Sequence, residues 1–267
     1  MGEYNMIKKH WWTVLLALLI TGTVHAQTVT LDYYFNHETH AGKNGQQQRF
    51  HYLWEDADNT GFSIWGEIFK KHGAALNSLD VAPTINNLKG TSIYIIVDPD
   101  NAKESPAPNY MSDAHAAQIA QWVKAGGVLV LMANDSANVE LENFNILAAK
   151  FGLHFNNEMQ NHVVDDNHFN DGSAVIADRT LFKTTQKVFL KDVCTITAGK
   201  SAKTVLKSAD GTAAIAIALK YGKGTVFVVS DPWLYNEYVN GRLPKEYEND
   251  KAADDLAQWL ISKAKGK

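Results

Sequence analysis

The sequence of 267 residues contains one cysteine, Cys194. A single cysteine cannot form a disulfide within the chain, so disulfide-stabilised small domains are excluded and the fold must rest on its apolar core. Cys194 lies in the alternating segment 189–197, which is typical of a strand and lacks the glycines of a nucleophile elbow. We therefore expect Cys194 to be structural. Because no cysteine follows the N-terminal apolar run closely, we also expect no lipid anchor at the N-terminus that signal cleavage would create.

Positive charge is also sparse. The chain has 25 Lys and Arg residues against 29 Asp and Glu residues, without a basic cluster. This balance gives no support for nucleic acid or an anionic membrane as a partner. His37, His40 and His51 show no metal-binding spacing such as His-Glu-x-x-His. The sequence therefore predicts neither a metal site nor a cofactor.

Long apolar runs are missing after the N-terminal region. Lys8 and Lys9 precede the apolar run 11–20, and Val24 and Ala26 offer small side chains at the −3 and −1 positions of a cleavage site. Residues 1–26 are thus expected to be a signal peptide. No later segment approaches the roughly 18 continuous apolar residues that a membrane span needs. We predict a periplasmic or secreted protein without stable membrane insertion after signal cleavage.

Residues 27–267 alternate between strand and helix patterns, which predicts a single α/β domain with a mainly parallel sheet. We expect the first strand at residues 29–35 and apolar strands at 91–97, 128–132 and 225–229. Helical spacing of apolar residues predicts helices at 61–72, 112–124, 144–151 and 251–264. Short alternating segments between residues 153 and 223 predict an antiparallel extension of the same domain.

Four of the predicted strands are followed by polar side chains that the fold does not need. In open parallel sheets, ligands bind outside the carboxyl ends of the strands. These polar positions should therefore meet along one rim. They are Asn36, His37, Glu38 and His40 after the first strand, Asp98 and Asp100 after the second, Asn134, Asp135, Ser136 and Asn138 after the third, and Asp231, Asn236 and Glu237 after the last.

The segment 230–238 combines two carboxylates, an amide and three aromatic rings, and the segment 49–56 adds further aromatics and acids. Aromatic rings stack on the apolar face of a sugar while carboxylates and amides bind its hydroxyl groups. The predicted ligand is therefore an oligosaccharide or polysaccharide fragment. Alternatively, Pro232 only ends the strand and the aromatics fill the core. The predicted substrate-binding residues are His37, Glu38, His51, Trp54, Asn134, Trp233, Tyr235 and Asn236.

Paired carboxylates are what a glycoside hydrolase needs, one as a proton donor and one as a base or nucleophile. The candidates for catalysis are Asp231, Glu237, Asp135 and Glu55. Sequence gives no distance between them, so no pair is selected. A serine hydrolase is disfavoured because residues 133–137 lack the Gly-x-Ser-x-Gly spacing of a nucleophile elbow.

The chain resembles the class I glutamine amidotransferase-like superfamily, in particular exported Bacteroidetes domains that occur alone or fused to unsaturated rhamnogalacturonyl hydrolases. The resemblance rests on the segments 32–38, 50–55, 94–100, 127–136 and 221–237. It implies a flavodoxin-like three-layer sandwich and a setting in polysaccharide degradation. It does not imply amidotransferase chemistry, because the superfamily's catalytic cysteine position matches residues 133–137, where no cysteine is present.

Three functions remain open from the sequence. The first is a glycoside hydrolase acting on acidic or unsaturated oligosaccharides, and the second is a carbohydrate-binding or accessory module without catalysis. The third is a structural domain with a vestigial pocket. A pair of carboxyl groups about 5 to 10 Å apart in an enclosed pocket would favour the hydrolase. The sequence leaves the sugar, the linkage and the oligomeric state undetermined.

Overall fold

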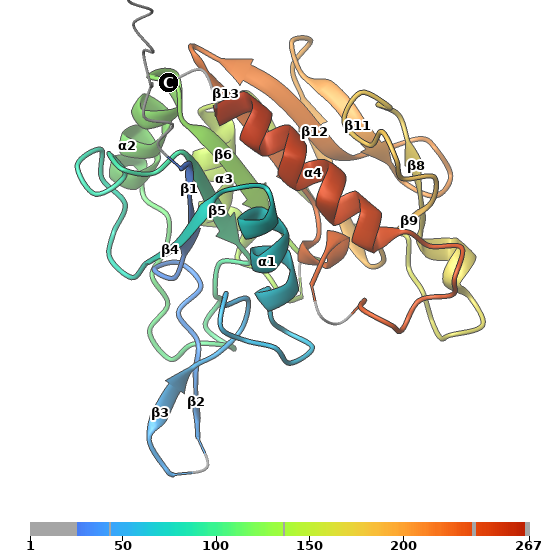
Figure 1. Cartoon of the computed structure of the whole chain (residues 1–267), viewed down its shortest axis with the longest axis horizontal. Helices are drawn as coiled ribbons and strands as arrows, with labels where there is room; N and C mark the ends of the chain where they lie inside the picture. Colours follow the sequence, from blue (N-terminus) through green and yellow to red (C-terminus); the bar gives the residue numbers. More distant parts are fainter. Residues whose placement is uncertain (1–25, 43, 136, 237–238, 265–267) are drawn as a thin grey trace, which may run out of the picture.

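The structure is a computed structural model that describes residues 26–42, 44–135, 137–236 and 239–264 (Figure 1). Its centre is a nine-stranded sheet in the order β4-β1-β5-β6-β13-β12-β11-β8-β9. The first five of these strands pair in parallel. They are β4 (Ala75–Leu79), β1 (Thr28–Asp32), β5 (Ile93–Val97), β6 (Val128–Met132) and β13 (Gly224–Val229). The prediction of a mixed α/β domain with a mainly parallel core is confirmed.

The remaining four strands of the sheet are antiparallel, as predicted for the region between residues 153 and 223. They are β12 (Ala214–Tyr221), β11 (Lys203–Lys207), β8 (Ser173–Ile176) and β9 (Val188–Phe189). The predicted single strand around Cys194 is divided. Its second half, β10 (Val193–Ala198), leaves the main sheet and pairs with β7 (Leu153–Gln160).

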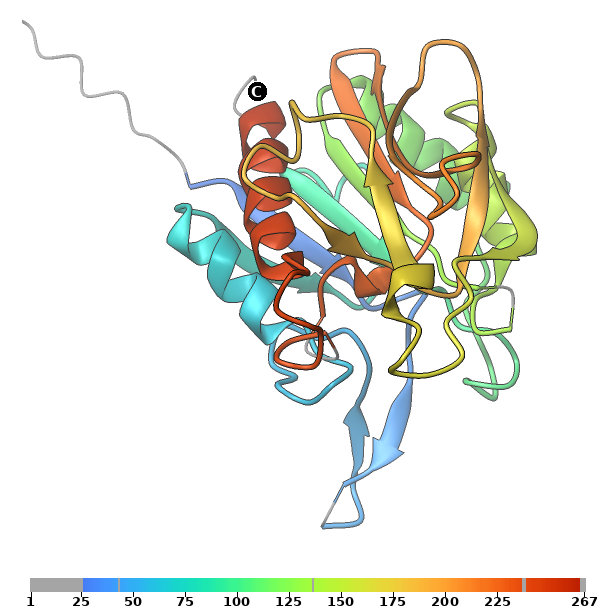
Figure 2. The same cartoon turned by 90° about the vertical axis from the view of Figure 1, so that its right-hand side faces the viewer.

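Helices cover both faces of the sheet (Figure 2). On one face α1 (Ser63–Lys71) and α4 (Asn249–Ala264) pack on strand residues such as Ile93, Ile95 and Val97. On the other face α2 (Asp113–Lys124) and α3 (Leu141–Ala149) pack on the alternate residues, among them Tyr94 and Ile96. Each fully buried side chain of this kind stabilises the fold by about 1.5–3 kcal/mol. The apolar run of each strand is therefore explained by burial on both faces.

Local sequence signals set the ends of α2. The Ser112 Oγ atom accepts a hydrogen bond from the His115 backbone N–H at 3.3 Å, which confirms the predicted N-cap. After the helix, Gly126 adopts a φ of 124°. A Cβ atom at Gly127 would lie 2.5 Å from the Trp122 ring, so only glycine fits where the chain turns into β6.

The first strand and the edge strand β4 are among the elements that differ from the sequence prediction. The first strand ends at Asp32, because the Asp32 carboxylate accepts the backbone N–H groups of Tyr34 and Phe35 and turns the chain. The edge strand β4 was not predicted, because Asn77 and Ser78 interrupt its apolar pattern. Both changes leave the carboxyl ends of the parallel strands at one edge of the sheet.

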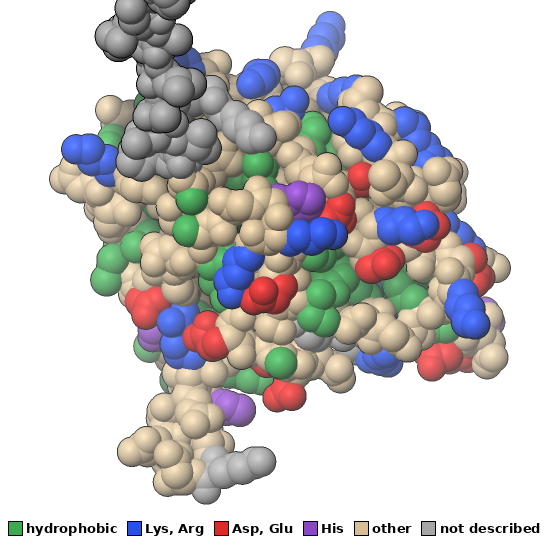
Figure 3. Space-filling view, viewed as in Figure 1, with side chains coloured by type: hydrophobic (Ala, Val, Ile, Leu, Met, Phe, Trp, Pro, Cys, Tyr) green, Lys and Arg blue, Asp and Glu red, His purple; other side chains and the backbone are tan. Residues whose placement is uncertain are grey.

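A hairpin of β2 (Thr39–Ala41) and β3 (Gln47–Arg49) projects from this end of the molecule, opposite the end where the C-terminus lies (Figure 1). Lys, Arg, Asp and Glu side chains are interspersed over the face that carries α1 and α4 (Figure 3). Within the described ranges, none of the helices combines the length and the apolar character that a bilayer crossing requires.

Candidate functional site

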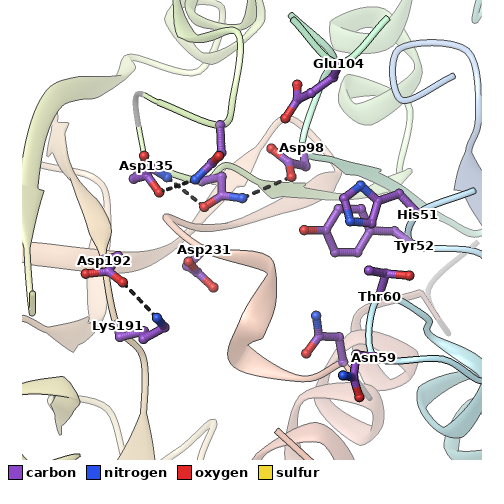
Figure 4. A pocket seen from close by; sticks show the side chains of 13 residues that line it. His51, Tyr52, Asn59, Thr60, Asp98, Glu104, Asp135, Lys191, Asp192 and Asp231 are labelled. Carbon is purple, nitrogen blue, oxygen red and sulfur yellow. Dashed lines mark hydrogen bonds and ion pairs between the residues drawn. The ribbon is translucent and has the colours of Figure 1, made fainter. Parts of the chain in front are cut away.

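A polar pocket of about 290 Å³ lies at the carboxyl edge of the parallel strands (Figure 4). Its residues come from the loops after β5, β6 and β13, from the loop between β3 and α1, and from the segment that precedes β10. Segments far apart in sequence therefore build one site. The lining residues are His51, Tyr52, Asn59, Thr60, Asp98, Glu104, Asn134, Asp135, Asn138, Lys191, Asp192, Asp231 and Asn236.

Asp98 is the most perturbed carboxyl group of this pocket. It directly follows β5 and is only 5% exposed. The Asn134 side-chain amide donates to its Oδ2 atom at 3.0 Å, whereas its buried Oδ1 atom has no hydrogen-bond partner within the described part of the chain. Burial raises the pKa of Asp98 to about 8, and this effect outweighs the hydrogen bond from Asn134. Asp98 is therefore mostly a neutral carboxylic acid at pH 7.

The backbone is strained at the same place. Five non-glycine residues of the described chain have positive φ angles, and four of them line this pocket. The four are His51 (φ 67°), Tyr52 (φ 49°), Asp98 (φ 43°) and Asp192 (φ 51°). Such conformations cost of order 1 kcal/mol or more each for residues with a Cβ atom, and they concentrate at functional sites. The concentration of strained residues therefore favours this pocket over the other pockets as the functional site.

The His51 ring is held in place by the carboxylate of Glu38, which does not itself line the pocket. Its Nδ1 atom is 2.5 Å from Oε1 of Glu38, and both side chains are largely buried. Burial alone would lower the pKa of His51, but the hydrogen bond and the charge of Glu38 raise it above the ordinary value of 6.5. The His51 ring also stacks on Phe50 and Tyr52, with ring centroids 4.5 and 4.7 Å apart. Its position is therefore fixed from three sides.

Replacing Glu38 by glutamine should lower the pKa of His51, because the imidazolium would lose its carboxylate partner while its burial remains. An NMR titration of the His51 ring protons measures this pKa directly. The matched control is Glu55→Gln, which removes an exposed carboxylate of the same loop region. An unchanged His51 midpoint in Glu38→Gln would show that the pair does not set the charge of the ring.

Asp135 and Asn134 follow β6 and connect the pocket to its own loop. The Asp135 carboxylate accepts the Ala137 backbone N–H at 2.7 Å and the Asn138 side-chain amide at 2.6 Å, one on each oxygen. Asn134 accepts the Asp135 backbone N–H while it donates to Asp98. Asp135 thus organises the loop and still faces the pocket, and Asn134 orients Asp98.

Asp231 and Asn236 close the pocket from the end of β13, where Pro232–Leu234 forms a short 3-10 helix (η2). Asp231 is 2% exposed and Asn236 1% exposed. Figure 4 shows Asp98, Asp231 and Tyr52 around the same space, although they belong to three different segments. Burial raises the pKa of Tyr52 well above its ordinary value, and the charges of Asp98 and Asp231 add to this effect. Tyr52 therefore presents a neutral hydroxyl group.

Some of the predicted site residues line the pocket and others do not. Those that line it are His51, Asn134, Asp135, Asp231 and Asn236. Glu38 does not line the pocket, but its carboxylate contacts the His51 ring. His37, Trp54, Glu55 and Tyr235 do not line it. Glu237 lies outside the described residues, and so does the side chain of Trp233.

Trp54 and Tyr235 belong to the core, as the alternative interpretation of the aromatics proposed. Trp54 packs against Trp65 and Phe69, and its indole N–H donates to the Asn77 carbonyl at 2.9 Å. Tyr235 is 3% exposed within the cluster beneath α4. Their rings fill space between helix and sheet, so they are unavailable to a sugar in the pocket.

Glu55 and His37 also lie outside the pocket, where each makes other contacts. Glu55 is exposed and lies 3.9 Å from Arg49, which anchors the projecting hairpin. The exposed His37 ring contacts the Tyr33 carbonyl at 2.9 Å, and its backbone N–H donates to Asp100. Neither residue shares a cavity with Asp98 or Asp231.

Sequence reasoning missed several lining residues. Asp98 was recognised at a strand end but not among the catalytic candidates, because nothing in the sequence shows that its carboxyl group is buried. Lys191 and Asp192 were missed because they precede a strand of the separate β7–β10 pair, whose position depends on tertiary packing. The lysine lies 3.0 Å from the Asp192 carboxylate. No group of three or more His, Cys, Asp or Glu side chains in the described ranges is arranged to hold a metal ion.

A family model described as "Domain of unknown function (DUF4350)" matches residues 55–240, which include most of the pocket. The chain belongs to this family. A comparison with curated protein sequences finds no significant match. The family assignment covers the strands and loops that position Asp98, Asn134, Asp192 and Asp231, and it carries no activity with it.

Solved structures similar to this DUF4350 protein show its fold. The mmIFT52 N-terminal domain shares 17% identity at a TM-score of 0.63, covering 88% of this chain and 98% of that domain. The exo-β-1,4-mannosidase Op5Man5 from Opitutaceae bacterium strain TAV5 shares 12% identity at a TM-score of 0.51. A β-galactosidase from Rahnella sp. R3 shares 15% identity at 0.52. The match covers 89% of this chain in both cases, but only 36% of the mannosidase and 32% of the β-galactosidase.

Proposed function

We propose that this DUF4350 protein is an exported carbohydrate-active protein that binds a saccharide in the pocket between Asp98 and Asp231. The observation that carries the proposal is the composition of the pocket. Its walls combine carboxyl groups with the side-chain amides of Asn59, Asn134 and Asn138 and the hydroxyl groups of Tyr52 and Thr60. Sugar hydroxyl groups both donate and accept hydrogen bonds, and this mixture of side chains provides partners for both.

The size and place of the pocket support the same proposal. A space of about 290 Å³ is at the lower end of small-ligand sites and accommodates one or two sugar rings. It lies outside the carboxyl ends of the strands, where open α/β sheets bind their ligands. The five parallel strands have the order 2-1-3-4-5, which supports the flavodoxin-like architecture and the resemblance to exported glutamine amidotransferase-like domains.

Glycoside hydrolysis is the second candidate function, and Asp98 favours it. A proton donor to a glycosidic oxygen must be protonated at the working pH, and burial keeps Asp98 so. Asp98 also lines the pocket, so its carboxyl group lies beside a ligand bound there. Asp231, across the same space, would act as the second carboxylate (Figure 4). The structural similarity to two glycoside hydrolases covers about a third of each, and therefore does not favour hydrolysis over binding.

A screen of the purified protein against pectic, arabinogalactan and ulvan oligosaccharides, together with neutral and amino-sugar oligosaccharides, tests the proposal. Binding is read by calorimetry and cleavage by new reducing ends. Binding without cleavage supports a binding module, and binding with cleavage supports the hydrolase. Absence of binding to every sugar would contradict the proposed function and leave the structural interpretation.

A further inference from the structure

A second pocket, of about 200 Å³, shares the wall residue Lys191 with the first. Its other walls come from the segment between β7 and β8, from the segment that precedes α4, and from Phe189 at the end of β9. Both segments lie toward the end of the molecule from which the hairpin projects (Figure 2). Figure 4 shows Lys191 across the first pocket from His51 and Tyr52. The two pockets therefore meet on the Lys191 side of the site.

Asp192 ties the walls of the two pockets together. It lines the first pocket, and one of its carboxylate oxygens lies 3.0 Å from the Lys191 ammonium. The other oxygen accepts the backbone N–H of Val163, a wall residue of the second pocket, at 3.4 Å. The Asp192 backbone N–H donates to the Asn161 carbonyl at 3.0 Å, and both residues have positive φ angles. Strained backbone of the kind found at functional sites thus lies where the two pockets meet.

The linings of the two pockets differ in their chemistry. The first offers carboxyl, amide and hydroxyl groups, whereas the second is largely apolar. In the second pocket Val164 is 64% exposed, and the partly exposed Phe169 ring packs on Phe189 with ring centroids 5.4 Å apart. The apolar face of a sugar ring stacks on aromatic and aliphatic surfaces of this kind. The second pocket therefore offers the stacking contact that the first pocket lacks among the described side chains.

The charged side chains of the second pocket are balanced. Lys191 and Arg242 line it together with Asp165 and Asp166, and Asp165 lies 2.6 Å from His168. Such a lining neither strongly attracts nor strongly repels a charged sugar. Lys191 and Arg242 each carry several N–H donors that suit the hydroxyl oxygens of a sugar. Apolar contact therefore decides which ring face is bound, and the two cations orient the ring.

We propose that the second pocket binds a further ring of the saccharide held in the first, so that the ligand is an oligosaccharide that passes Lys191. The proposal rests on the saccharide-binding function proposed above. The ring in the second pocket turns its apolar face toward Val164 and Phe169 and its hydroxyl groups toward Lys191 and Arg242. The groove beside the projecting hairpin is the competing place for further rings. Among the described residues, it shares no wall residue with the first pocket.

Chain length is the first readout of the test. Chains of one to six rings of galacturonate, of β-1,4-linked galactose and of β-1,4-linked glucose are titrated by calorimetry. In a series that binds, we expect a gain in affinity of at least about tenfold when the chain becomes long enough to reach the second pocket, and no gain beyond that length. The methyl NMR signals of Val163 and Val164 should shift with the longer chains and stay in place with the shorter ones.

Three variants locate the gain. Val164→Asp places a carboxylate in the apolar wall, at a position too exposed for a large effect on stability. It should weaken binding of the longer chains at least about fivefold and leave the shortest binding chain unchanged. Phe169→Ala, which removes the stacking ring, should have the same selective effect. The matched control is Val81→Asp, the same change at a valine that is 56% exposed and lines neither pocket, and it should retain the full gain.

Two results overturn the proposal and are distinguishable. An affinity that is independent of chain length, or a gain that Val164→Asp retains in full, contradicts the second pocket as a binding site while the saccharide-binding function stands. Failure of the wild-type protein to bind any chain, or any other sugar of the screen, contradicts the proposed function and this inference together.

Discussion

Replacing Asp98 by asparagine is expected to raise the melting temperature at pH 9 by roughly 10 °C and by about a third as much at pH 5. The cause is the buried carboxyl group, whose pKa rises from 3.8 to about 8 on folding. Between these two values the folded protein binds more protons than the unfolded chain. The free energy of unfolding therefore falls as the pH rises through this window, by on the order of 6 kcal/mol from Asp98 alone.

Asparagine removes this loss because it is uncharged at every pH and has nearly the shape of the protonated acid. Two further buried carboxyl groups act in the same direction, since burial raises the pKa of Asp32 to about 6 and that of Asp100 to about 7. The wild-type protein should thus lose stability from pH 5 to pH 9, and Asp98→Asn should lose less.

Circular dichroism melts across this pH range measure the effect, with Glu55→Gln as the exposed control. Coincident pH profiles for wild type and Asp98→Asn would show that Asp98 is ionised at an ordinary pKa in the folded state. A stabilising substitution at this position would mark Asp98 as a residue kept at the expense of stability, as at many functional sites.

The second large effect concerns Asp231. Asp231→Asn should weaken saccharide binding by about 100-fold, because a buried carboxylate that accepts hydrogen bonds from the ligand is worth roughly 1.5–3 kcal/mol. The size and shape of the side chain are retained, so the free energy of unfolding should change by no more than about 1 kcal/mol.

Calorimetry with a sugar found in the screen compares Asp231→Asn with Glu55→Gln. Both carboxylates were predicted from the sequence as catalytic, but only Asp231 lines the pocket. The Glu55 variant should therefore bind within about twofold of wild type. Equal binding by wild type and Asp231→Asn, or a larger loss in the Glu55 variant, would contradict the assignment of the pocket.

The sequence was sufficient to predict the parallel core and the rim where the pocket forms. Each apolar strand is followed within a few residues by polar ones, and the pattern is visible in the sequence because a parallel strand that is buried on both faces must be apolar throughout. The same reasoning placed Asn134, Asp135, Asp231 and Asn236 at one edge, where the structure brings them together.

The remaining features depend on packing that the sequence does not display. Trp54 follows His51 by three residues, yet one ring enters the core beside α1 and the other faces the pocket. The positive φ angles of His51 and Tyr52 turn the chain between His51 and Trp54. Positive φ angles are common for glycine, but the sequence does not predict them at histidine or tyrosine. Burial of Asp98 likewise arises only when the loops after β5 and β6 meet.

The most direct test of the central claim is NMR mapping of the site with the tightest-binding sugar of the screen. The account predicts that the largest shifts fall on the side-chain amides of Asn59, Asn134, Asn138 and Asn236 and on the His51 ring, because these groups line one pocket. It further predicts that Asp231→Asn removes these shifts. Shifts confined to the groove between the projecting hairpin and Glu55, with the pocket amides unmoved, would contradict the account.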